Sequence, residues 1–211
     1  MQRTQRTLGR PRKEQDGIST KDLILHTATG MFLEKGYPSV SMDDVAQKCD
    51  FTKATVYYYY KTKADLFTDA MVQLMIRIKQ RIIDILSTNA SLETQLFQIA
   101  KAHIQATVDI DINAFMKEAK TSLSDDQLQL MKEAEDNMYG ALEQAIKKAM
   151  DKGEIPQSNP RLGALMFVSM LTAGNNLDNA YKETFSSLDD LVTQIVNLFW
   201  NGLANENQSS L

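Results

Sequence analysis

Residues 41–60, "SMDDVAQKCDFTKATVYYYY", read as two short helices joined by a turn at residues 49–51. The apolar residues of the first helix recur at i, i+3, i+4 and i+7, which places them on one face; they are Met42, Val45, Ala46 and Cys49. Val56 and Tyr60, one turn apart, continue this face in the second helix. The pattern predicts a helix-turn-helix whose inner face packs on a small core.

The four consecutive tyrosines at 57–60 cannot all face that core. Successive residues on a helix point about 100° apart, so with the last tyrosine inside, the first two point outward and the third lies at the edge. Lys53 and Thr55 share the outer face. Hydroxyl and ammonium groups donate to phosphate oxygens, and tyrosine rings and threonine methyls pack on thymine methyls. The outer face therefore suits the surface of DNA.

The rest of the chain also reads as helical. It has only 9 Gly and 4 Pro and no alternating Val/Ile/Thr runs bounded by turns, so strand signals are nearly absent. Helix-start signals of the form Ser/Thr-x-x-acid or Gln recur along it. We expect an all-α fold of about nine helices, near residues 19–35, 41–48, 52–60, 62–87, 91–109, 110–120, 124–152, 159–181 and 187–203.

A longer pattern extends over residues 24–67. It has an aromatic and Gly-Tyr at the end of the first helix, then Ser-x-x-x-Val-Ala, then Thr-x-Tyr-x-x-Tyr-x-x-Lys-x-x-Leu; these positions are Phe32, Gly36, Tyr37, Ser41, Val45, Ala46, Thr55, Tyr57, Tyr60, Lys63 and Leu66. The pattern closely resembles the DNA-binding domain of the TetR family of bacterial transcriptional regulators. The resemblance implies a flexible basic arm at 1–17, a three-helix DNA-binding domain at 18–64 and a larger helical ligand-binding and dimerisation domain at 65–211.

Three residues depart from the family pattern without threatening the fold. Asp50 stands where the family usually has glycine in the inter-helix turn, and aspartate tolerates a left-handed backbone better than most residues. Tyr60 replaces the usual phenylalanine, so its hydroxyl must reach water or a partner. Gly30 inside the first helix costs up to about 1 kcal/mol relative to alanine.

The resemblance implies that the outward tyrosines contact DNA and that Lys63 meets phosphate at the start of the next helix; a solvated lysine is the alternative. Arg10 and Arg12 flank Pro11 in an arm suited to a narrow minor groove, with a disordered basic tail that attracts phosphate non-specifically as the alternative. The full set of predicted DNA contacts is Arg10, Arg12, Ser41, Thr52, Lys53, Thr55, Tyr57, Tyr58, Tyr59 and Lys63.

The last two long helices are the predicted dimer face. Small residues alternate with large apolar ones in 163–174, which permits close helix approach, and one apolar stripe follows 188–199. A single recognition helix contacts too few base pairs, so two related by a twofold axis would read a palindrome. The alternative is that both stripes are core within one chain. The predicted interface residues are Leu165, Ser169, Ala173, Leu188, Leu191, Ile195, Leu198 and Phe199.

The middle helices, 62–152, should enclose the ligand site that the resemblance implies. The candidate lining residues are Met71, Leu74, Met75, His103, Phe115, Met116, Met138 and Met170. The chain has 11 methionines, which suit an adaptable apolar pocket, although methionine at helical spacing is more often ordinary core. For His103, a core histidine paired to a neighbour is the simpler interpretation. The ligand is not identified.

Charge is unevenly distributed along the 211 residues. Residues 1–63 carry 11 Lys and Arg against 7 Asp and Glu, a net of +4, whereas the remainder carries 12 against 20, a net of −8. This favours a polyanion-binding end on a body that avoids polyanions. The single cysteine, Cys49, excludes an internal disulfide and fits a cytoplasmic location. A signal peptide and an apolar run long enough to cross a bilayer are not expected.

Enzymatic motifs are missing from the sequence. It has two histidines and no G-x-S-x-G, phosphate loop, G-x-G-x-x-G or His/Cys metal cluster, so we expect no catalysis, no cofactor and no metal. The predicted function is a homodimeric repressor that a small apolar molecule releases from a palindromic operator. The alternative is a DNA-bound adaptor whose body recruits a protein partner.

Overall fold

The computed structural model describes residues 19–107 and 112–204, leaving out the side chains of residues 112–115, 179 and 204. The described residues form ten helices and no strand, which confirms the all-α prediction. The helices are α1 (Thr20–Lys35), α2 (Met42–Lys48), α3 (Lys53–Tyr59), α4 (Lys63–Leu86), α5 (Leu92–Thr107), α6 (Ile112–Lys120), α7 (Asp125–Asp151), α8 (Pro160–Asn175), α9 (Asn179–Lys182) and α10 (Leu188–Ala204). Within these two ranges, no helix is both long and apolar enough to span a bilayer.

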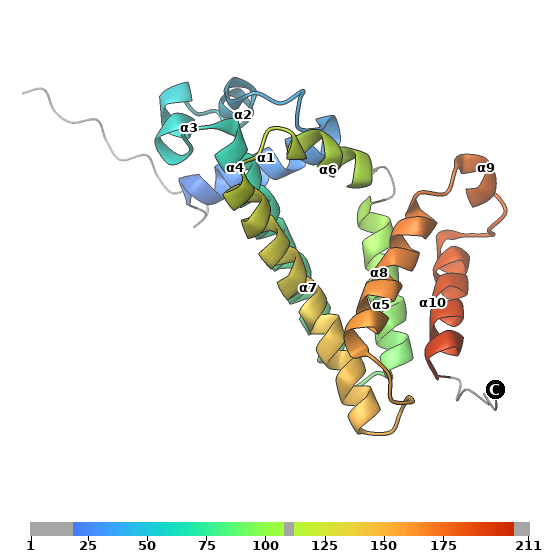
Figure 1. Cartoon of the computed structure of the whole chain (residues 1–211). Coiled ribbons are helices and arrows are strands. Elements are labelled where there is room, and N and C mark those ends of the chain that lie inside the picture. The colour runs from blue at the N-terminus through green and yellow to red at the C-terminus, as the bar shows by residue number, and fades with distance from the viewer. Residues whose placement is uncertain (1–18, 108–111, 205–211) are drawn as a thin grey trace, which may run out of the picture.

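Helices α1, α2 and α3 gather at one end of the molecule, where α4 begins (Figure 1). Each of the three starts behind a hydroxyl side chain that accepts from an amide of the first turn; these side chains are Ser19, Ser41 and Thr52. The core of this end is aromatic. Phe67 of α4 meets Phe32 and Tyr37 edge to face, with ring centroids 5.1 and 4.9 Å away. The start of α4 is therefore part of the helix-turn-helix core.

Helices α4 and α7 lie side by side and run in the same direction away from the helix-turn-helix end (Figure 1). Near their N-termini, Met71 and Met131 share the first core. Near their C-termini, Ile85 and Ile146 share a second core. Because Leu66 and Phe67 of α4 belong to the first core, apolar packing crosses residue 64, where we predicted a domain boundary; that division stays a prediction.

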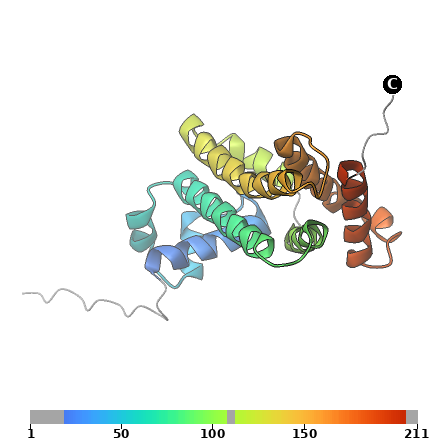
Figure 2. The same ribbon diagram turned by 90° about the horizontal axis from the view of Figure 1, so that it is seen from below.

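Helices α5, α8 and α10 form the other part of the body (Figure 2) and contribute most of the residues of the second core. Phe167 of α8 and Phe199 of α10 pack with ring centroids 5.0 Å apart. Gly174 lets α8 approach α10 closely, because a Cβ at this position would overlap Cδ1 of Ile195. Gly174 thus serves packing within the chain.

The prediction of one helix over 159–181 is wrong. Helix α8 ends at Asn175, and the short α9 starts separately at Asn179. Asparagine and aspartate compete with the helix ladder through their own hydrogen bonds. Asn175 donates from Nδ2 to the carbonyl of Thr107 at 2.6 Å, and Asp178 accepts the amide of Tyr181 at 2.8 Å. These side-chain contacts end one helix and begin the next.

Candidate nucleic-acid interface

The turn between α2 and α3 has the geometry that the sequence predicts. Asp50 has a φ of 55°, in the left-handed region. The amide of Phe51 donates to the carbonyl of Ala46 at 2.9 Å, which closes the turn. Aspartate therefore takes the place of glycine without loss of the turn, and α3 follows α2 as in a helix-turn-helix.

The orientation predicted for the tyrosine run is confirmed. Val56 is fully buried and Tyr60 is 5% exposed, whereas Tyr57, Tyr58 and Tyr59 are 44%, 76% and 38% exposed. Three aromatic rings with hydroxyl groups consequently stand on the surface of one short helix. Their contact with DNA stays a prediction.

Tyr60 finds a partner inside the chain. Its hydroxyl donates to Oδ2 of Asp69 on α4 at 2.7 Å, and Nζ of Lys21 on α1 lies 2.9 Å from the same oxygen. Burial raises the pKa of Asp69, but hydrogen bonds from Tyr60, Lys21 and Gln73 outweigh it, so this pKa lies below its usual value. Burial and the Asp69 carboxylate together raise the pKa of Tyr60. Asp69 thus joins α1, the end of α3 and α4.

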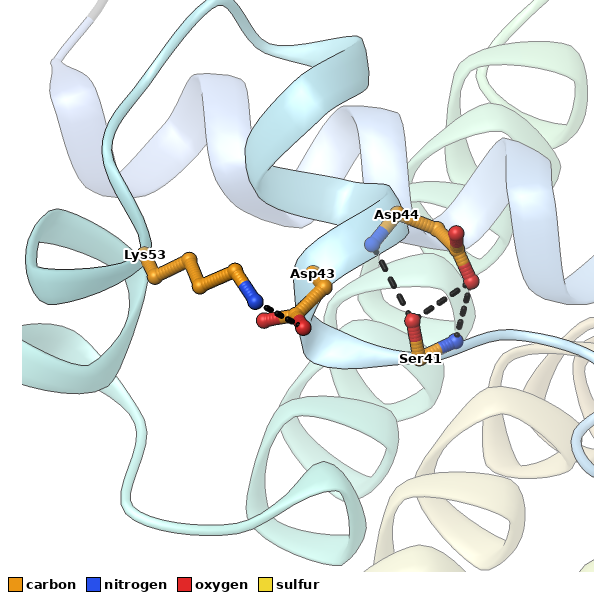
Figure 3. Close-up of polar contacts among 4 residues, drawn as sticks. All are labelled: Ser41, Asp43, Asp44 and Lys53. Atoms are coloured by element: carbon orange, nitrogen blue, oxygen red, sulfur yellow. Dashed lines mark hydrogen bonds and ion pairs between the residues drawn. The ribbon is translucent and has the colours of Figure 1, made fainter.

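Two of the predicted polar contacts are already engaged within α2 and α3 (Figure 3). Lys53, at the start of α3, reaches Asp43 in the first turn of α2 and forms an ion pair, and the hydrogen bond to Asp43 raises the pKa of Lys53. Ser41 caps α2 by accepting the amide of Asp44 at 3.1 Å. Both side chains remain exposed, so DNA would have to compete with these internal partners.

Threonine hydroxyls occupy the start of α3. Thr52 accepts the amide of Thr55 at 3.2 Å, and the two hydroxyl oxygens lie 2.9 Å apart. The cap fixes where α3 begins and so which residues face outward.

Lys63 is folded back on its own domain. Its ammonium donates to the carbonyls of Tyr37 and Pro38 at 2.9 and 3.4 Å and lies 4.3 Å from the centroid of the Tyr37 ring. Burial lowers the pKa of Lys63. An ammonium has three N–H donors, so Lys63 could donate to a phosphate in addition to these two carbonyls. That contact stays a prediction. Arg10 and Arg12 lie outside the described residues.

The predicted dimer residues separate into two groups. Leu165, Ser169 and Ala173 of α8 and Leu198 of α10 are exposed. Leu188 is half-buried, and the other three are buried in the second core of their own chain; they are Leu191, Ile195 and Phe199. Their burial corrects the expectation that the whole α10 stripe faces a partner, because this stripe packs on α5 and α8 instead.

The predicted pocket residues do not line a common site in the described structure. Met71 is buried in the first core, and Leu74 and Met116 pack against it, whereas Met138 and Met170 pack against the second core. Met75 is half-buried, and the side chain of Phe115 lies outside the described residues. An open groove of about 380 Å³ lies elsewhere; its lining residues are Tyr139, Leu165, Val168, Ser169, Thr172, Ala173 and Asn176.

His103 differs from the expected paired core histidine. Its Nε2 is buried and has no hydrogen-bond partner among the residues that the structure describes. Burial lowers the pKa of His103, which favours the neutral imidazole. A neutral ring offers one donor and one acceptor nitrogen.

Sequence reasoning missed three residues that organise this end of the molecule: Asp43, Asp69 and Gln127. A carboxylate in the first turn of a helix complements the helix dipole, but Asp43 also pairs with Lys53. The sequence indicates that the Tyr60 hydroxyl needs a hydrogen-bond partner but not which one. Asp69, nine residues further on, accepts this hydrogen bond. Gln127 closes the capping box of α7 and also donates to Asp65 of α4, a contact that depends on how α7 packs on α4.

The fold and this site together define a helix-turn-helix DNA-binding protein. The family model of the tetR family of bacterial regulatory proteins matches residues 24–70, so the helix-turn-helix end of the chain is a DNA-binding domain of the TetR type. It is similar to the HTH-type transcriptional regulator YhgD of Bacillus subtilis, with 24% identity over 158 residues, or 74% of this chain and 82% of YhgD. The chain is a transcriptional regulator rather than an enzyme.

Two further similarities differ in how much of the chain they cover. IcaR of Staphylococcus epidermidis, a negative transcriptional regulator of the biofilm operon icaADBC, is 36% identical over 47 residues, which are 22% of this chain and 25% of IcaR. FadR of Bacillus subtilis in complex with stearoyl-CoA superposes with a TM-score of 0.68 and 18% identity, covering 85% of this chain and 97% of FadR. The second similarity extends the shared fold to the body.

Proposed function

We propose that the chain is a homodimeric repressor that reads a palindromic operator with α3 and is released by a small apolar ligand. The observation that carries the DNA-binding part is the outer face of α3. Tyr57, Tyr58 and Tyr59 are exposed there, at the position where a helix-turn-helix enters the major groove. Their hydroxyls can donate to phosphate or base edges, and their rings can pack on thymine methyls.

The dimer is supported by apolar surface at the far end of the body. Leu162, Leu165 and Met166, spaced at i, i+3 and i+4 on α8, are 55%, 37% and 48% exposed, and Leu198 on α10 is 69% exposed. Contiguous exposed apolar side chains of this kind mark protein interfaces. A twofold axis through this surface would present two recognition helices to one palindrome.

The repressor role is supported by IcaR, a negative transcriptional regulator that is 36% identical to this chain over 47 residues. The ligand is supported by FadR, which shares the fold and binds stearoyl-CoA. In this chain, the buried Nε2 of His103 is the candidate polar contact for such a molecule. Ligand binding would shift α4, which is joined to α3 through Asp69, and so change the population of the DNA-bound state. A DNA-binding role supports the proposed cytoplasmic location.

The first test is selection of bound DNA from a random-sequence pool with the purified full chain at near-physiological salt. Enrichment of an inverted repeat is the expected result, because a symmetric dimer reads two half-sites. Binding that is only unspecific and strongly salt-dependent would overturn the proposal, since it would show phosphate attraction alone.

The second test uses the selected fragment and a panel of acyl-CoA esters with long and short chains, because the acyl chain supplies the apolar part that the body is proposed to bind. We expect at least one ester to raise the Kd for DNA by tenfold or more, and His103→Leu to weaken that response without changing DNA affinity in the absence of ester. Release by none of the esters, together with capture of a protein that binds the DNA-bound chain, would favour the adaptor over the ligand-released repressor.

A further inference from the structure

Two helix caps meet where the body joins the helix-turn-helix. At the start of α4, the amide of Thr62 donates to Oδ2 of Asp65 at 3.1 Å and the amide of Asp65 donates to Oγ1 of Thr62 at 3.0 Å. At the start of α7, the amide of Ser124 donates to Oε1 of Gln127 at 2.9 Å and the amide of Gln127 donates to Oγ of Ser124 at 3.3 Å. Both are capping boxes.

The two boxes are linked by their closing residues. Nε2 of Gln127 donates to Oδ1 of Asp65 at 2.9 Å in a partly buried position. Asp65 therefore uses one oxygen for its own cap and the other for Gln127, and Gln127 divides its oxygen and nitrogen in the same way. Because α4 and α7 run in the same direction, their positive ends lie together, and one carboxylate stabilises both.

The bond between Gln127 and Asp65 lies in the first turn of α4, close in sequence to the recognition helix α3. Helix α4 starts at Lys63, four residues after the end of α3 at Tyr59. Around the link, Ala119, Leu123 and Met131 pack against the core that also holds Val56 of α3. A displacement of the start of α7 must therefore either break the bond between Gln127 and Asp65 or move the first turn of α4.

We propose that Gln127 is a positioning residue for the recognition helix, which fixes the first turn of α4, and with it α3, to the start of α7. The inference rests on the proposed DNA-binding function. It names the residue through which the body controls the position of the recognition helix. Loosening this one bond loosens α3 relative to the body.

The test exploits the chemistry of the cap. Gln127→Glu keeps the capping box of α7, because glutamate also closes such a box, but it replaces the donor to Asp65 with a second acceptor. Gln129→Glu is the matched control, since Gln129 donates to Glu133 at 2.9 Å within α7 and the charge change is the same. The double variant D65N/Q127E exchanges donor and acceptor and restores the link with the charge of the original pair.

Two measurements are made on the full chain. Hydrogen exchange of the free protein reports on amides 62–66, and the Kd for the selected DNA fragment reports on α3. We expect Q127E to speed exchange at these amides and to raise the Kd, each roughly tenfold, because a hydrogen bond to a charged group is lost. Q129E should match the wild type, and D65N/Q127E should return both values to within about threefold.

The inference would be overturned if amides 62–66 of Q127E exchanged at the same rate as in the wild type. It would also be overturned if Q127E and Q129E changed the exchange rates and the Kd equally. The same holds if D65N/Q127E fails to restore exchange while its thermal unfolding matches that of the wild type. Since exchange is measured without DNA, it decides on the link independently. Failure of the wild type to select any DNA would instead overturn the proposed function and leave the exchange result to stand.

Discussion

Lys53 carries the positive charge of α3, yet a carboxylate of the same chain holds it. Its ammonium pairs with Asp43 across the turn (Figure 3), and both side chains are exposed. An exposed pair is weak because water and salt screen it, so a phosphate can replace Asp43. In the proposed complex, the pair would therefore reduce DNA affinity without preventing binding.

Asp43→Asn should tighten DNA binding. The change frees Lys53 and removes a negative charge near the DNA, while Ser41 and Asp44 still cap α2. We expect a lower Kd and a slope of log K against log salt that is steeper by about one. Fluorescence anisotropy over a salt series measures both. Asp151→Asn, which frees Lys147 from a similar exposed pair at the far end of α7, should leave the Kd unchanged; equal effects of the two variants would contradict the prediction.

Tyr60→Phe should destabilise the chain even though phenylalanine is usual for the family. The variant removes a hydrogen bond from a buried hydroxyl to the Asp69 carboxylate. Hydrogen bonds to charged groups are worth about 1.5–3 kcal/mol, and Lys21 remains as a partner, so we expect a loss of roughly 1–2 kcal/mol. Urea unfolding measures it, with Tyr58→Phe, at an exposed position, as the neutral control. Equal stability of the two variants would show that the Tyr60 hydroxyl contributes nothing.

Asp69 should make stability depend on pH. Its pKa lies below the usual value in the folded chain, so its contribution is fully present above the unfolded pKa of about 3.9 and is lost as the pH falls through the folded value. The difference in unfolding free energy between wild type and Asp69→Asn should therefore be largest near neutral pH and narrow below about pH 4. Denaturant titrations of both proteins across this range measure the difference, which would stay constant if Asp69 were not stabilised in its charged form.

Elements that depend on local patterns followed from the sequence, and those that depend on neighbours did not. Capping residues and apolar spacing fixed α2, α3 and the tyrosine orientation within a residue or two. The break after Asn175 was missed because its side chain is committed to a carbonyl of α5, 68 residues away. The stripe from Leu191 to Phe199 has the same spacing whether it packs on its own chain or on a partner, and only the packing of α10 on α5 and α8 decides between them.

Gly174→Ala should reveal how closely α8 and α10 approach. The added Cβ overlaps Cδ1 of Ile195, and overpacking costs about 1–3 kcal/mol against a helix-propensity gain of at most about 1 kcal/mol. We expect a net loss of about 1 kcal/mol in urea unfolding, which Ile195→Val should partly relieve in the double variant. Gly140→Ala on α7, where nothing lies within 4 Å of the new Cβ, should be stabilising, and a similar gain for Gly174→Ala would contradict the close approach.

At the scale of the whole molecule, charge and shape separate the two ends. Residues 1–63 have a net charge of +4 and the remainder −8, so DNA is expected to attract the N-terminal part of the chain and to repel the acidic remainder. Helices α8 and α10 lie on the opposite side of the body from α3 (Figure 1). In the proposed dimer, this arrangement keeps the subunit contact away from the DNA and leaves both recognition helices free to reach it.

Leu198→Glu should convert the proposed dimer to monomers without unfolding the chain. The side chain is 69% exposed, so glutamate costs little within one chain, whereas burying its charge without a partner in an interface is strongly unfavourable. We expect the sedimentation coefficient of a monomer, an unchanged circular dichroism spectrum and a Kd for the selected inverted repeat raised by at least about tenfold, since each monomer holds only one half-site. Leu130→Glu, at a 53% exposed position on α7, is the control for a charge placed elsewhere on the surface. If Leu198→Glu remained dimeric and bound DNA as tightly as Leu130→Glu, the apolar surface of α8 and α10 would not be the subunit contact, and the two recognition helices would have to be paired through another face.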